Sequence, residues 1–213
     1  MCKGRIAKSM ENLFQCGVDK NIWDKYVNHV FIEKNIYPRE PNVWAIIEWK
    51  QYLVQDYFCI SAEKDIRQNL EQGLVINDET FNRYKSRGNK YLHHYSFIYN
   101  CDKKAIIQSD PKTATLDYIK FINDIERYEW RILPCMVGYY VFCSTLKEKQ
   151  LNFTEDLCCR GKLRFIEAHT EKLYLEHVED RLSRMQEDPS YIDDFNMGVL
   201  HKVRFFDECI AKE

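Results

Sequence analysis

Apolar side chains recur at steps of three and four residues through much of this chain, and this spacing is what most restricts its fold. Within 43–62, Ile46, Trp49, Leu53, Tyr57 and Ile60 fall on one stripe of a helix. The same periodicity is present in three further segments, 113–132, 173–185 and 190–210. Each stripe has to be buried against another element, so the pattern predicts helices packed around a common core.

Few turn-forming residues interrupt these segments. The 213 residues include only 7 glycines and 5 prolines, whereas a many-stranded fold needs such residues at most of its connections. We also expect helix in 11–34, a loop at 35–42, and a helix that starts at the capping sequence 77–80 and continues to Leu92. With no visible linker, the sequence predicts an all-α helical bundle of about seven or eight helices, a single domain spanning residues 1–213.

The charge balance excludes several classes of partner. Lys plus Arg number 31 and Asp plus Glu 33, which gives a net charge of −2 and no electrostatic case for nucleic acid or a membrane surface. No stretch approaches the roughly 20 apolar residues of a membrane span, and the first five residues lack the apolar block of a secretory signal. We therefore expect a soluble cytoplasmic protein whose partner is a small molecule or another protein.

The nine cysteines and six histidines do not form a recognisable metal site. The cysteines show no paired CxxC spacing and the histidines no HExxH pair. Without an export signal, most cysteines are expected to be reduced thiols packed as small hydrophobic groups. We expect neither a metal nor a cofactor.

Asp56 is a polar residue placed where the periodicity predicts core. Tyr52, Asp56 and Cys59 stand at i, i+4 and i+7, so they share one face of a helix. A buried carboxylate must find donors or take up a proton. Spacing alone favours an Asp held by a neighbouring tyrosine or backbone amide over a functional carboxylate.

Cys135 follows Pro134 inside an apolar run that extends from Ile132 to Cys143. The proline either kinks a helix or begins a new one. Tyr139 at i+4 places a phenol on the face of Cys135, and Gly138 allows another segment to approach closely. A kinked core helix with an inert thiol is the commoner outcome of such a sequence, because burial suppresses the thiolate.

Lys202 falls near the edge of the apolar stripe of 190–210. An ammonium is unfavourable there unless it reaches outward to solvent or is paired. Two interpretations remain open, a side chain that extends to the surface and an ion pair with Asp56 inside a cavity.

Five segments, taken together, resemble the TenA (thiaminase II) family of the haem-oxygenase-like all-α fold. The matching segments are the helix motif 23–31, the YxxQDY-like stretch 52–57, the sequence 111–113 with Tyr118 and Phe121, the LPCxxxY-like stretch 133–139, and the pair Phe205 and Phe206. The correspondence runs nearly from end to end.

The resemblance implies helices around a polar pocket that binds an aminopyrimidine, usually in a homotetramer. Cys135 would then be the nucleophile, Asp56 the carboxylate that orients the pyrimidine and activates the thiol, and Tyr139 a hydrogen-bonding group of the pocket. Tyr52 on the face of Asp56 would also belong to the substrate-binding site. A thiol is well suited to this role because it is the best side-chain nucleophile near neutral pH.

Three residues depart from the family pattern at the expected pocket. His169 and Cys59 each stand where the family has a tyrosine, and Lys202 aligns with the C-terminal glutamate that gives and takes protons. A protonated lysine has donors and no acceptor, so Lys202 cannot replace a carboxylate.

Three functions remain open from the sequence. The first is hydrolysis of an aminopyrimidine or thiamin, with His169 able to act as acid and base. The second is a divergent, catalytically silent protein that binds a different small molecule through Lys202 and His169. The third, more remote function is that of other branches of the fold, which include the cofactorless oxidase of pyrroloquinoline quinone synthesis and haem oxygenase. His29 would then be a haem ligand.

Overall fold

The computed structural model describes residues 2–36, 43–72, 104, 108–124, 126–148 and 166–210, and within these ranges it contains helices and no strand. The all-α prediction is confirmed. The elements are α1 (Cys2–Cys16), α2 (Lys20–Val27), the π-helical η1 (Ile32–Ile36), α3 (Val43–Gln72), α6 (Thr113–Ile122), α7 (Tyr128–Glu148), α9 (Lys172–Glu187), the 3-10 turn η2 (Pro189–Tyr191) and α10 (Ile192–Ile210).

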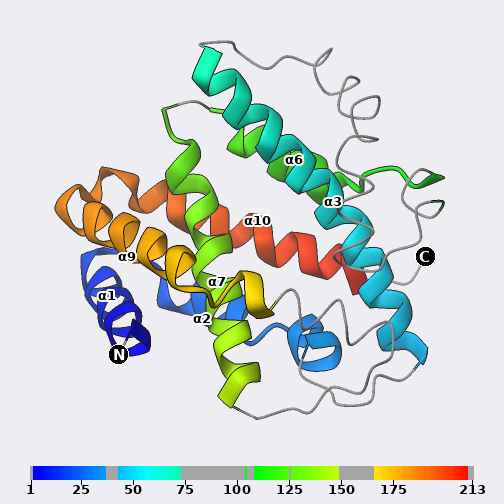
Figure 1. The fold of residues 1–213 in the computed structure, drawn as a ribbon, viewed down its shortest axis with the longest axis horizontal. Helices are drawn as coiled ribbons and strands as arrows, with labels where there is room; N and C mark the ends of the chain where they lie inside the picture. Colours follow the sequence, from blue (N-terminus) through cyan, green and yellow to red (C-terminus); the bar gives the residue numbers. More distant parts are fainter. Residues whose placement is uncertain are drawn as a thin grey trace.

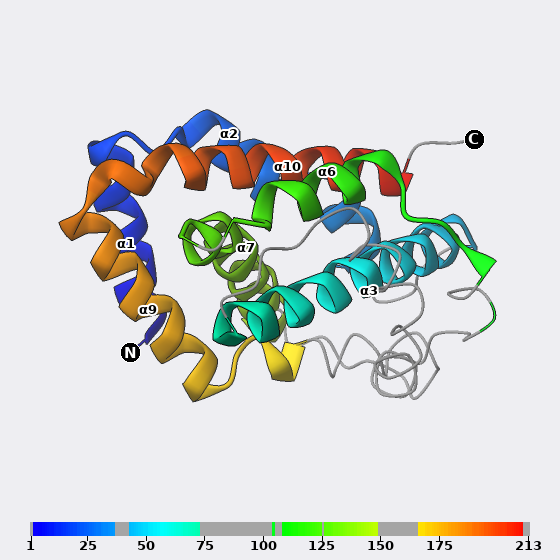
Figure 2. The ribbon, with the colours of Figure 1, turned by 90° about the horizontal axis from the view of Figure 1, so that it is seen from above.

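Helix α10 is the element on which the others assemble. It crosses α7 and packs against α2, α3 and α6 as well (Figure 1). Helices α1 and α9 lie side by side at one end of the molecule (Figure 2). Helix α3 packs mainly against α6 and α10, while α7 packs against α10 and α9, so α3 and α7 approach the same helix from different sides. No described helix is long and apolar enough to cross a membrane.

The segment 11–34 is helical as expected, and the structure divides it among α1, α2 and η1. Gly17 follows the last residue of α1 with φ of 118°, a left-handed conformation that ends helices. Asp19 then begins α2 because its carboxylate accepts from the backbone N–H groups of Asn21 and Ile22. A second break at Asn28 separates α2 from η1.

The expected helix 113–132 is likewise two helices. Helix α6 ends at Ile122 with Asn123 as its cap, and α7 begins at Tyr128. The apolar spacing continues across this break, which is why periodicity alone joined the two. The helices predicted in 43–62, 173–185 and 190–210 are confirmed as α3, α9 and α10. The predicted helix from 77 to 92, and residues 37–42 of the predicted loop, lie outside the described residues.

Helix α6 is capped by side chains from two other helices. The Gln55 amide oxygen accepts from the Lys112 N–H at 2.7 Å and from the Thr115 hydroxyl at 2.8 Å. The Glu208 carboxylate accepts from the Ala114 N–H at 2.8 Å. Lys112 itself offers no side-chain cap, so α3 and α10 supply the acceptors that the first turn of α6 needs.

Pro134 lies inside α7 rather than at the start of a new helix. Small residues allow close packing on both sides of this region. A Cβ on Gly138 would lie 2.3 Å from the Tyr26 ring, and one on Gly198 of α10 would lie 2.7 Å from the Arg131 carbonyl oxygen. The expected close approach at Gly138 is therefore made by the Tyr26 ring of α2.

The core beside α10 is built from aromatic rings. Phe206 stacks on Phe31, with centroids 5.0 Å apart, and on Tyr26, with centroids 5.7 Å apart. Both Phe205 and Phe206 are buried. This core fixes the position of the α10 face that carries Lys202.

Candidate active site

A cavity of about 180 Å³ lies between α3, α7, α10 and the segment 166–174. Six of the seven residues that the sequence predicted for the site line it. The lining residues are Asp56, Cys59, Ile60, Glu63, Arg67, Ile132, Cys135, Met136, Tyr139, His169, Tyr174 and Lys202. The seventh, Tyr52, stands behind this wall and donates its hydroxyl hydrogen to the Tyr139 oxygen at 3.0 Å.

One face of α3 forms the first wall. Asp56, Cys59 and Glu63 follow each other at i, i+3 and i+7, which brings all three to the same side of the helix. The residues predicted on this face ended at Cys59. Continuing the same helical spacing by another turn would have found Glu63.

The second wall is α7, where Cys135 and Tyr139 both line the cavity one helical turn apart. Tyr174 reaches across from α9 and donates its hydroxyl hydrogen to the Met136 carbonyl at 2.8 Å. Pro134 is buried behind this turn. The i+4 relation of Cys135 and Tyr139 predicted from the sequence therefore holds inside a continuous helix.

The hydroxyl of Tyr139 joins three helices. It accepts from the Lys202 ammonium at 3.1 Å and from the Tyr52 hydroxyl at 3.0 Å, and it donates to Asp56 Oδ1 at 3.4 Å. Lys202 and Asp56 are thus connected through a phenol. The carboxylate has the tyrosine partner expected of a satisfied Asp, and it faces the cavity as well.

Lys202 is buried, with only 1% of its surface exposed, so the surface-reaching interpretation is wrong. Its ammonium lies 4.2 Å from the centroid of the Phe205 ring and 5.1 Å from that of Tyr118, distances at which aromatic faces attract a cation. Burial opposes the charge, but the electrostatic interactions of Lys202 with Cys135, Cys59, Asp56 and Glu63 outweigh it, and the pKa of Lys202 is raised.

The Cys135 side chain is a protonated thiol at neutral pH. Burial raises its pKa to about 11, although the nearby Lys202 charge and a hydrogen bond from Tyr139 act in the opposite direction. Glu63 and Asp56 add to the increase. A reaction that uses this sulfur must therefore remove its proton as the new bond forms.

Glu63 is a carboxylic acid that titrates near neutrality. Burial raises its pKa to about 7 against the opposing effect of Arg67 and Lys202. The Arg67 guanidinium donates through Nε to the Tyr128 hydroxyl at 3.1 Å. A carboxyl group with a pKa in this range can both donate and accept a proton at physiological pH.

The comparison with known proteins identifies the fold. No family model matches the sequence, and no curated protein matches it. A solved protein from Sulfolobus solfataricus, described as a TenA-like thiaminase, is 15% identical with a TM-score of 0.64, and the match covers 94% of both chains. A TenA homologue from P. horikoshii is 14% identical with a TM-score of 0.63 over 99% of this chain and 98% of the other. A protein of Silicibacter sp., described as a TenA family transcription regulator, is 16% identical with a TM-score of 0.60 over 91% and 93%.

The chain has the TenA fold. The resemblance first drawn from short motifs therefore extends through the whole architecture. In this TenA fold, the YxxQDY-like and LPCxxxY-like stretches meet at the cavity, and the Phe205 and Phe206 pair packs behind Lys202.

The three departures from the TenA pattern, Cys59, His169 and Lys202, all line the cavity. The His169 ring lies edge-on to the rings of Tyr139 and Tyr174, with centroids 5.1 Å away in each case. All three departures expected at the pocket are therefore found in the cavity wall.

His29, the residue considered as a haem ligand, has both ring nitrogens engaged. Nε2 hydrogen-bonds to Asp207 at 3.0 Å, and Nδ1 accepts from the Phe31 backbone N–H at 3.1 Å. The second bond places the proton of the neutral ring on Nε2. His29 is a structural residue that joins the α2–η1 connection to α10.

Proposed function

We propose that this chain hydrolyses an aminopyrimidine, or the aminopyrimidine half of thiamin, with Cys135 as the nucleophile. The observation that carries the proposal is the convergence of Cys135, Asp56 and Tyr139 from two helices on one cavity. A thiol beside a carboxylate and a phenol, enclosed by apolar and aromatic groups, is an arrangement suited to nucleophilic catalysis.

Each residue has a distinct task in this proposal. Asp56 accepts a hydrogen bond from the exocyclic amine and so orients the ring. The Cys135 sulfur bonds to an electron-poor ring carbon while its proton passes to the carboxylate of Asp56. The high pKa of the thiol makes this concerted proton transfer necessary. Tyr139 keeps Asp56 and Lys202 in place through its hydroxyl.

The overall reaction is a substitution by water. The leaving group departs as ammonia from an aminomethylpyrimidine or as the thiazole from thiamin, water takes its place, and the sulfur is released with its proton restored. This sequence requires no cofactor. The Sulfolobus neighbour described as a TenA-like thiaminase lends support from a protein of the same fold.

The test is release of ammonia from 4-amino-5-aminomethyl-2-methylpyrimidine and of the thiazole from thiamin. We expect turnover by the natural chain and none by Cys135→Ala. Cys143→Ala serves as the matched control, because Cys143 is a buried thiol of the same helix outside the cavity lining. Turnover by the natural chain no faster than by Cys135→Ala would refute the proposal.

A second candidate is a protein of this fold that binds a different small molecule without hydrolysing it. The observation in its favour is the buried Lys202 ammonium in the cavity wall. If the chain has this second function, Lys202→Glu should change which ligands raise the melting temperature of the protein. The bond from Lys202 to Tyr139 argues for a cation that organises the pocket, and an unchanged ligand profile would eliminate this candidate.

We also propose, from the TenA resemblance, that the chain forms a homotetramer. Light scattering coupled to size-exclusion chromatography measures it directly. A mass near the 25.7 kDa of one chain would contradict it.

A further inference from the structure

The cavity contains a second carboxyl group that the proposed reaction leaves unused. Glu63 lines the cavity from α3, and within the described residues no hydrogen bond or ion pair is made to its carboxylate. Arg67, the cation one helical turn further along the same face, directs its Nε to the Tyr128 hydroxyl. A carboxyl group in a protein-lined cavity without a bound partner is available to a ligand.

The spacing of Asp56 and Glu63 matches a particular kind of ligand. Seven residues are close to two helical turns, so the two side chains lie on the same face with a rise of about 10.5 Å between them. A six-membered ring with an amine at one end and a ring nitrogen at the opposite end, with a hydrogen bond of about 2.9 Å on each side, spans on the order of 10 Å. The axial rise between Asp56 and Glu63 is therefore comparable to the length of such a ring with its two hydrogen bonds.

The electrostatic surroundings give the two carboxyl groups different roles. Asp56 is linked through Tyr139 to the buried ammonium of Lys202, which favours its charged form as an acceptor for an amine N–H. Glu63 lacks such a link, and burial brings its pKa to about 7. It can therefore donate a hydrogen to a basic ring nitrogen or accept one from it.

We propose that Glu63 binds the ring nitrogen opposite the amine of the substrate and exchanges a proton with it, while Asp56 binds the amine. This inference rests on the proposed function for the aminopyrimidine class and adds a further catalytic residue. The neutral Glu63 gives its proton to the ring nitrogen as the sulfur adds, which withdraws electrons from the carbon under attack. It recovers that proton when the sulfur leaves, so Glu63 ends the cycle unchanged.

The proposal also accounts for Lys202. The residue at this position cannot accept a proton from a ring in its charged state. Glu63 offers the missing acceptor from α3, and Lys202 instead supplies positive charge to Asp56 and Cys135. The acid–base function and the cationic function are thus placed on two separate helices.

Two small probes test the proposal by binding alone. 4-Aminopyrimidine has the ring nitrogen opposite its amine, whereas 2-aminopyridine lacks it and keeps the nitrogen adjacent to the amine. By isothermal titration calorimetry we expect the natural chain to prefer 4-aminopyrimidine by about tenfold or more, the value of one hydrogen bond to a charged group. The preference should fall to about threefold or less in Glu63→Gln.

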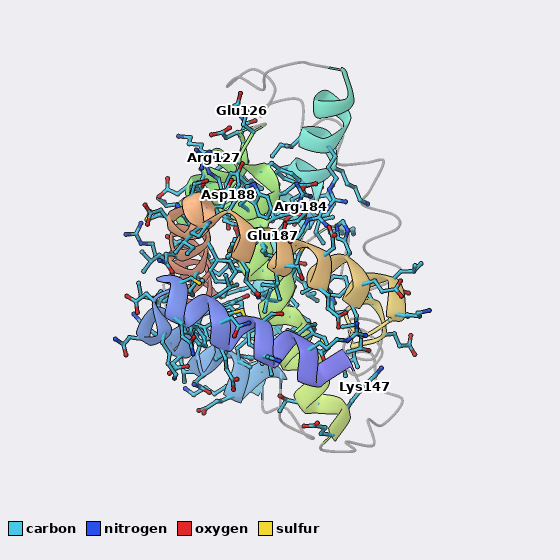
Figure 3. All side chains as sticks on the ribbon, turned by 90° about the vertical axis from the view of Figure 1, so that its left-hand side faces the viewer. Glu126, Arg127, Lys147, Arg184, Glu187 and Asp188 are labelled. Atoms are coloured by element: carbon cyan, nitrogen blue, oxygen red, sulfur yellow. The ribbon has the colours of Figure 1, made fainter. Side chains whose placement is uncertain are left out.

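Glu187→Gln is the matched control. Glu187 is an exposed glutamate at the end of α9 (Figure 3). It should leave both affinities unchanged. Because Glu63→Gln could fail to fold, a second measurement needs no variant. The ring nitrogen of ¹⁵N-labelled 4-aminopyrimidine bound to the natural chain at pH 6.5 should shift upfield, as expected for a nitrogen that gains a proton.

The outcomes separate this inference from the proposed function. An unchanged preference in Glu63→Gln, an unshifted ¹⁵N signal, or no binding of 4-aminopyrimidine would each overturn it. Ammonia release that depends on Cys135 but not on Glu63 would retain the hydrolase and refute the role of Glu63. Binding that depends on Glu63 without any turnover would retain the binding role of Glu63 and refute the hydrolase.

Discussion

Lys202 donates a hydrogen bond to Tyr139 from within an aromatic enclosure, and this bond ties α10 to α7 across the cavity. A lysine ammonium buried this deeply is stable only with a fixed acceptor and compensating negative charge. The phenol provides the first and Asp56, bonded to the same hydroxyl, provides the second. Lys202 therefore places a cation, with Asp56 as its counterpart, in the wall of the cavity.

Lys202→Met should destabilise the fold by about 3 kcal/mol, because it leaves Asp56 without its cationic counterpart. It should also raise the pKa of the Cys135 thiol further, since the Lys202 charge now lowers it. Chemical denaturation and the alkylation rate of Cys135 measure the two effects. Lys172→Met is the control, because the Lys172 side chain is 83% exposed. A variant as stable as the natural chain would show that the linkage carries no net energy.

Tyr139→Phe should reduce turnover by at least about a hundredfold, a typical contribution of a positioned proton-transfer or hydrogen-bonding group. It removes the hydroxyl shared by Lys202, Tyr52 and Asp56, and stability should fall by about 1–3 kcal/mol. Tyr140→Phe is the matched change, because Tyr140 is the next residue of the same helix and is buried outside the cavity lining. Equal losses of activity in both variants would contradict the role of the hydroxyl.

The pKa of Glu63 should appear in the pH dependence of stability. Its pKa is raised from 4.5 to about 7, so its stabilising contribution is complete below pH 4.5 and is lost as pH rises through 7. Between pH 5 and 8 the natural chain should lose at most about 3 kcal/mol relative to Glu63→Gln. Urea denaturation at fixed ionic strength measures this, with Glu187→Gln as the flat reference. A constant difference over the range would mean that Glu63 has an ordinary pKa.

Alkylation of Cys135 by iodoacetamide should be slow at neutral pH. With a pKa of about 11, about one thiol in three thousand is ionised at pH 7.5. The rate, followed by site-resolved mass spectrometry, should rise about tenfold per pH unit between 8 and 10. The exposed thiol Cys16 provides the reference within the same molecule. A plateau below pH 9 would reveal a thiolate that burial does not suppress.

Gly138→Ala should destabilise the chain by about 1–3 kcal/mol despite the better helix propensity of alanine. The new Cβ would lie 2.3–2.6 Å from ring and hydroxyl atoms of Tyr26, which is buried and has little room to move. Gly4→Ala in α1 is the reference, because nothing lies within 4 Å of its Cβ position, and it should stabilise by up to about 1 kcal/mol. Thermal denaturation measures the stability of both variants, and the prediction concerns the difference between Gly138→Ala and Gly4→Ala.

Much of the architecture could be predicted from the sequence because apolar periodicity reports directly on which face of a helix is buried. The stripes of α9 and α10 gave these helices nearly their observed extents, whereas α3 continues to Gln72, ten residues beyond the predicted segment 43–62. The breaks after α1 and α6 were not predicted, because the apolar spacing continues through them. Gly17 and Asp19 were the local signals at the first break.

The site could be predicted only in part. Six predicted residues line the cavity, and Tyr52 stands directly behind them. Helical spacing places Asp56 with Cys59 and Cys135 with Tyr139 on shared faces. Glu63 was missed because it lies just beyond the predicted segment 43–62, in the part of α3 that the apolar pattern did not reveal. The Lys202 to Tyr139 bond joins residues 63 positions apart, and no helical spacing reports on such a contact. The roles of these residues, and the single-domain organisation over residues 1–213, remain predictions.

The capping of α6 by Gln55 and Glu208 makes this helix dependent on its neighbours for its first turn. Tyr118, which lies against the Lys202 ammonium, belongs to the same short helix. Loss of the Glu208 cap would therefore weaken the first turn of α6 and leave the Tyr118 ring beside the Lys202 ammonium less firmly held, although Glu208 lies 73 residues from Cys135 in the sequence.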